Sequence, residues 1–111
     1  MSKYIIVRTY CDSLDISNKI IFCLLEKRLV AGSQIVTITS EYWWDNEKRK
    51  KEEFQLSFRS RYDLFPAIKK EILNIHSYEV PEISCTEILD GNQEFFDWID
   101  KEVEKGVFKC D

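Results

Sequence analysis

The sequence is poor in the features that mark membrane, secreted and low-complexity chains. Glycine occurs three times and proline twice among 111 residues, and no repeat or low-complexity segment is present. No apolar run approaches the roughly 20 residues that span a bilayer. The opening segment, MSKYIIVRTY, has too short an apolar run for a signal peptide. We therefore expect no membrane partner.

The chain also lacks paired cysteine motifs. Cys11, Cys23, Cys85 and Cys110 are far apart and form no CxxC pair. This spacing indicates neither a zinc ribbon nor a redox pair. We interpret the four residues as reduced thiols, which is typical of a cytoplasmic protein.

A basic surplus is missing too. Lys and Arg number 16 against 20 Asp and Glu, which gives a net charge of −4. Nucleic-acid binders usually carry the opposite balance, so we expect no nucleic-acid partner. The sequence has no glycine-rich phosphate loop, no zinc-protease motif and no convincing Ser-His-Asp or Cys-His arrangement. The prediction is that this protein is not an enzyme.

The sequence contains enough apolar residues to form the core of one domain over residues 1–111. Hydrophobic residues make up 44% of the chain and aromatic residues 14%. A run of β-forming residues predicts a buried strand at 4–9, alternation of apolar and polar residues predicts a hairpin over 33–60, and a further strand is expected at 79–88. Apolar residues at helical spacing predict three helices: one from residue 12 to 31, one from 62 to 75, and one after Asn92. Gly32 is expected to end the first of them. Asp45 and Asn46 suit the hairpin turn.

The order β-α-β-β-α-β-α predicts an α+β fold, a ferredoxin-like sandwich with an antiparallel sheet and an extra C-terminal helix. The expected sheet order is 4-1-3-2. We take the third strand as parallel to the first, so the ends of both strands meet the start of the fourth. That arrangement predicts a polar cluster of Cys11, Arg59, Arg61, His76, Tyr78 and Glu79, with the hairpin tip at the opposite end.

The hairpin tip carries three large aromatic residues, Tyr42, Trp43 and Trp44. Exposed apolar surface is unfavourable by about 25 cal/mol per Å². A patch of this kind is typical of an interface, so we expect the tip to dock on another copy of the chain. The alternative is that the tip folds back over its own sheet.

Three motifs together resemble the CutA family of divalent-cation tolerance proteins: EYWWDNEKRKKEEFQLSFRS, NIHSYEVPEI and GNQEFFDWI. The resemblance implies a homotrimer of ferredoxin-like subunits involved in the response to metal ions, with no cofactor required. This sequence departs from the family pattern at Gly32, where a cysteine often stands, and at Ser77, where a proline is usual. A third departure is the tip, where Asp45 follows Trp44.

The resemblance also implies copper, or another divalent cation, as a candidate ligand of His76 and, more loosely, Cys11. Imidazole and thiolate are a suitable soft pair for copper. The alternative for His76 is a hydrogen bond to a backbone carbonyl. An inter-subunit cleft is expected from Tyr42, Trp43, Trp44, Arg59, Tyr78 and Glu79, with a plain interface network as its alternative. Two other functions stay open, a PII-like small-ligand sensor and a trimeric protein-interaction scaffold.

Overall fold

The computed structural model describes residues 3–103. Its helices and strands are β1 (Tyr4–Cys11), α1 (Leu14–Glu26), β2 (Gly32–Trp44), β3 (Glu47–Arg61), the 3-10 turn η1 (Tyr62–Leu64), α2 (Phe65–Ile75), β4 (Ile83–Glu87) and α3 (Gln93–Glu102). This is the element order that the sequence predicts. Within the described residues no helix is both long enough and apolar enough to cross a bilayer.

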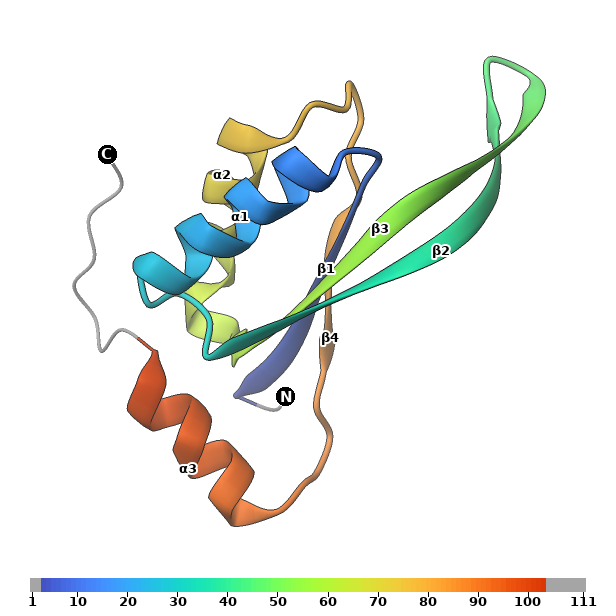
Figure 1. Ribbon diagram of the computed structural model, residues 1–111. Coiled ribbons are helices and arrows are strands. Elements are labelled where there is room, and N and C mark those ends of the chain that lie inside the picture. Colours follow the sequence, from blue (N-terminus) through green and yellow to red (C-terminus); the bar gives the residue numbers. More distant parts are fainter. Residues whose placement is uncertain (1–2, 104–111) are drawn as a thin grey trace.

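The strands form one antiparallel sheet in the order β2-β3-β1-β4, which confirms the predicted order and the α+β class. Helices α1 and α2 lie together on one face of the sheet (Figure 1). Alternate residues of β1 and β3, among them Val7, Leu56 and Phe58, are fully buried with Ile20 of α1 and Ile68 of α2. The period-two strands and the helical stripes therefore meet in one core.

Helix α1 begins and ends differently from the prediction. Its N-cap is Ser13, whose Oγ accepts a hydrogen bond from the backbone N–H of Ile16 at 3.2 Å. The helix ends at Glu26, and Arg28 takes the left-handed conformation at φ 57° that a glycine usually provides. The prediction that Gly32 ends the helix is wrong, because Gly32 is the first residue of β2.

Gly32 serves packing against α3 instead. A Cβ atom at this position would lie 2.9 Å from Cη2 of Trp98. Next to it Phe96 stacks on Tyr4 with ring centroids 4.3 Å apart. Helix α3 thus closes the end of the sheet where β1 and β2 begin, and Figure 1 shows it there, beside the N-terminus.

The hairpin of β2 and β3 turns at Asp45 and Asn46, as predicted, with positive φ values of 53° and 61°. Two such residues in succession are typical of the two-residue turn that matches strand twist. β1 pairs with β3 only as far as Cys11, which lies opposite Phe54. The remaining part of the ribbon, residues 38–53, is called the arm below, and it extends past the body of the protein (Figure 1).

The predicted direction of β3 is wrong. β3 runs antiparallel to β1, with Tyr4 opposite Arg61 and Cys11 opposite Phe54. Arg59 and Arg61 therefore lie where β1 begins, away from His76. For the same reason the arm leaves the sheet at the end where β1 finishes, not at the opposite end. β4 is also shorter than predicted and starts two residues after Pro81, on an edge of the sheet.

Candidate functional site

His76 and Cys11 meet where α2 ends beside the last residue of β1. Cys11 is 1% exposed, and its Sγ lies 3.7 Å from Nε2 of His76. Nε2 also lies 2.8 Å from the backbone oxygen of Tyr10, to which it donates. Nδ1 accepts the backbone N–H of Tyr78 at 3.2 Å. The ring thus joins the end of β1 to the turn after α2.

These contacts define the neutral form of His76, protonated at Nε2 and accepting at Nδ1. Burial lowers the pKa of His76, because a charged ring would be poorly solvated there. Burial likewise raises the pKa of the Cys11 thiol. At neutral pH the pair is an uncharged imidazole beside an uncharged thiol.

The fit of a metal ion can be judged from these donors. The imidazole and sulfur that the sequence singles out are close together, but both ring nitrogens already have hydrogen-bond partners. Across residues 3–103 no group of three or more His, Cys, Asp or Glu side chains is placed to hold a metal ion. Because a stable site usually needs about four ligands, residues 3–103 of one chain do not by themselves complete a metal site.

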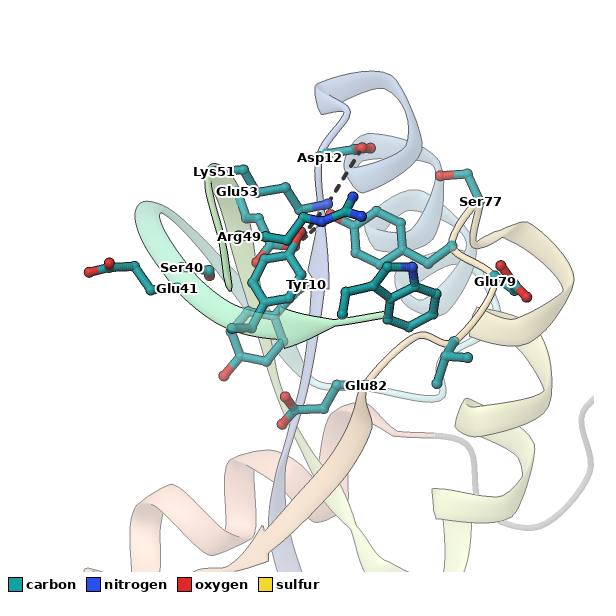
Figure 2. A pocket seen from close by; sticks show the side chains of 14 residues that line it. Tyr10, Asp12, Ser40, Glu41, Arg49, Lys51, Glu53, Ser77, Glu79 and Glu82 are labelled. Carbon is teal, nitrogen blue, oxygen red and sulfur yellow. Dashed lines mark hydrogen bonds and ion pairs between the residues drawn. The ribbon is translucent and has the colours of Figure 1, made fainter. Parts of the chain in front are cut away.

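A pocket of about 690 Å³ lies close by, between the arm and the segment from Ser77 to Glu82. Figure 2 shows that its side chains come from β1, from the arm and from the loop before β4. Aromatic rings form much of its wall: Tyr10, Tyr42, Trp44 and Tyr78. Five carboxylates and two cations complete its polar lining: Asp12, Glu41, Glu53, Glu79, Glu82, Arg49 and Lys51.

A charged network occupies the inner corner of this pocket. Tyr78 donates its hydroxyl to Glu53 at 2.5 Å, and Glu53 is only 7% exposed. Nζ of Lys51 lies 3.9 Å from a carboxylate oxygen of Glu53 and 3.9 Å from one of Asp12 (Figure 2). The same Nζ sits 4.2 Å from the centre of the Tyr78 ring. Burial and the Glu53 carboxylate both raise the pKa of Tyr78, so its hydroxyl stays protonated and donates.

The structure brings together four of the six residues expected in a cleft. Tyr42, Trp44, Tyr78 and Glu79 all line the pocket, within one chain. Trp43 points to the other face of the arm and is 70% exposed.

The sixth residue expected in the cleft, Arg59, is elsewhere. It pairs with Ile6 and Gly32 near the other end of the sheet. Arg61, which the predicted cluster also included, binds Asp63 and Asp100 there. The predicted grouping of these two arginines with His76 is therefore wrong, because it rested on the wrong direction of β3.

Sequence reasoning missed Tyr10, Asp12, Lys51 and Glu53. A signal was available for Lys51 and Glu53: by strand alternation they share a face with Gln55, opposite the face of Leu56 and Phe58. With the antiparallel register, that face continues through Tyr10, whose hydroxyl accepts from Gln55 at 3.1 Å. The correct register would have placed these side chains beside Tyr78.

The sequence and fold of this chain are similar to those of known proteins. Residues 5–102 match the family described as CutA1 divalent ion tolerance protein. The divalent-cation tolerance protein CutA of Archaeoglobus fulgidus is 37% identical over 92 residues, which cover 83% of this chain and 90% of that protein. This chain belongs to the CutA1 family. The resemblance seen in the sequence motifs is thereby confirmed.

Solved CutA structures share the whole CutA1 fold seen here. The periplasmic divalent cation tolerance protein CutA from Archaeoglobus fulgidus matches with a TM-score of 0.88 at 34% identity, covering 91% of this chain and 99% of that one. CutA1 from the psychrotrophic bacterium Shewanella sp. SIB1 matches with a TM-score of 0.89 at 30% identity, covering 94% and 98%. The arm and the loop from Ser77 to Glu82 therefore belong to a fold that CutA1 proteins have in common.

Proposed function

We propose that this CutA1 chain acts as a homotrimer in tolerance to divalent cations, without catalysing a reaction. The observation that carries the assembly is the arm. Seven strand pairs, from Ile38–Glu53 to Trp44–Glu47, lie beyond the last residue of β1. At about 3.3 Å per residue, the arm reaches roughly 23 Å past its neighbour in the sheet.

An isolated two-stranded ribbon is marginally stable in water. Both outer edges of the arm present backbone N–H and C=O groups that could pair with another strand. Trp43, 70% exposed, adds apolar surface that a second copy can cover. In a closed ring of copies every arm can pair its free edges and cover its apolar surface in the same way, because each arm docks on the next subunit.

The mass of the protein in solution tests this proposal. Light scattering after size-exclusion chromatography should give three times the chain mass of 13.3 kDa. A chain lacking the arm, with residues 40–51 replaced by a two-residue turn, should elute as a smaller species. A full-length protein that stays monomeric at micromolar concentration contradicts the proposal.

A second candidate function is copper binding by Cys11 and His76. The 3.7 Å separation of Sγ and Nε2 favours it, because two soft donors already face each other. Binding would require Nε2 to release the Tyr10 carbonyl, and further ligands would have to come from another subunit. In that case the assembly and the site depend on each other.

Equilibrium dialysis against copper and zinc tests this second candidate. Copper should be retained by the trimer, and retention should be lost in both His76→Ala and Cys11→Ser. Cys85→Ser serves as the matched control, since it removes a half-buried thiol on β4 outside the pair. Equal copper retention in all three variants contradicts the assignment.

The absence of catalysis and a cytoplasmic location are supported by the thiols. Cys11 is the cysteine beside the histidine, and at 1% exposure its sulfur is shielded from a substrate. Cys11 and Cys85 are free thiols, as expected in a reducing compartment. Cys110 lies outside the described residues.

A further inference from the structure

The pocket between the arm and the segment from Ser77 to Glu82 has the chemistry of a cation site. Its volume of about 690 Å³ is within the usual range for a small-molecule pocket. Carboxylates outnumber cations in the lining, five to two. Both cations already have partners: Lys51 lies beside Asp12 and Glu53, and Arg49 pairs with Glu47 at 3.2 Å. Lys51 thus engages two of the five lining carboxylates and leaves Glu41, Glu79 and Glu82 for a ligand.

The inner corner shows which group this lining accepts. An ammonium, that of Lys51, lies over the Tyr78 ring at 4.2 Å and 5.8 Å from the centre of the Tyr42 ring. Two carboxylates flank the same nitrogen. Aromatic faces and carboxylates around an ammonium are the arrangement by which proteins recognise organic cations.

The outer part of the pocket has a similar composition, with Arg49, which pairs with Glu47, as its one basic residue among those that line the pocket. Trp44 and Tyr10 add aromatic surface, and Glu79 and Glu82 bring carboxylates from the loop before β4 (Figure 2). We propose that this pocket binds a small organic cation, an amine or a quaternary ammonium ion. Trp44 and Tyr42 contact its apolar groups, Glu79 and Glu82 balance its charge, and Lys51 holds the inner carboxylates.

Two other ligand classes fit less well. An anion would meet the excess of carboxylates, and the two cations that could bind it are already paired. A bare metal ion needs several converging ligands, and residues 3–103 contain no group of three that could supply them. A larger cation with apolar substituents uses both the rings and the charge.

The proposal does not depend on copper binding, so a protein that fails the copper test can still pass this one. It requires that the docking of a neighbouring copy on the arm leaves the pocket open. The test uses the whole protein labelled with ¹⁵N and titrated with tetraethylammonium chloride or spermidine. The indole N–H signal of Trp44, assigned with Trp44→Phe, should shift and saturate. The signal of Trp98, packed against Gly32, should stay in place.

Two substitutions should change the affinity in opposite directions. Trp44→Ala removes a cation–π wall and should weaken binding about fivefold. Lys51→Met removes the resident ammonium and frees two carboxylates, so it should strengthen binding about fivefold. Lys48→Met is the matched control: it removes the same charge from the arm, on the face that carries Trp43, and should leave the affinity unchanged.

Any of three results overturns the proposal. The first is no saturable shift with either cation, which includes the case in which a second copy fills the pocket. The second is equal affinity in Trp44→Ala. The third is weaker binding of the cation in Lys51→Met, which would show that Lys51 does not compete with the ligand for Asp12 and Glu53. Circular dichroism of each variant confirms that it is folded.

Discussion

Replacing Trp43 by serine should separate the proposed subunits. A tryptophan offers about 250 Å² of side-chain surface, so 70% exposure leaves about 170 Å² open to water. Covering that area is worth at most about 4 kcal/mol at 25 cal/mol per Å², and about half of that after the losses of ordering an interface. Trp43→Ser should therefore weaken each contact by about thirtyfold to a thousandfold.

Sedimentation velocity over a wide concentration range measures this effect. The wild-type protein should keep one trimeric mass, whereas Trp43→Ser should dissociate on dilution. Phe22→Ser is a suitable control, because Phe22 on α1 is 68% exposed and distant from the arm. If both variants keep the trimeric mass, or if both lose it, the reasoning from the exposed arm is refuted.

Three further predictions concern the end of the sheet, the histidine and the pocket. Gly32→Ala should lower the free energy of unfolding in urea by about 1–3 kcal/mol, because the Cβ of the alanine would meet the Trp98 ring. Adding Trp98→Phe to that variant should recover part of the lost stability. The pKa of His76 is lower in the folded chain than in the unfolded chain, so as pH falls the unfolded chain binds a proton at His76 first. The contribution of neutral His76 to stability is therefore present above pH ~6.5 and is lost as pH falls through the pKa of the folded chain. His76→Gln should flatten that part of the plot of unfolding free energy against pH. Tyr78→Phe should destabilise by about 1–3 kcal/mol in thermal unfolding, because it leaves the buried Glu53 carboxylate without its hydroxyl donor, and an unchanged melting temperature would contradict this account.

Much of the fold could be predicted because its signals are local. The alternation of Leu56 and Phe58 with polar residues comes from strand geometry, and the spacing of Ile68 and Ile72 comes from helix geometry. The hairpin turn likewise follows from residues that tolerate a positive φ.

The end of α1 shows where local signals fail. Glycine is the usual left-handed residue, yet Arg28 takes this conformation. Its guanidinium reaches Glu102 at 2.9 Å, a contact 74 residues away in sequence. Such a distant partner cannot be read from the residues around the helix end.

The direction of β3 follows from the order of the elements. A hairpin reverses the chain, so β3 must oppose β2, and a crossover through α1 makes β2 parallel to β1. This reasoning gives the antiparallel pairing of Tyr4 with Arg61. The wrong positions predicted for Arg59, Arg61 and the arm all follow from taking β3 as parallel to β1.

By itself the sequence determined the order of the elements along the chain and the family, because periodicity, turn chemistry and motifs are properties of neighbouring residues. The sheet order deduced from that element order then placed His76 near Cys11. Only the tertiary structure decided what each side chain meets. It joined Lys51, Glu53 and Tyr78 in one corner and occupied both nitrogens of His76. Contacts of this kind depend on register and strand direction, which are set when distant segments pack together.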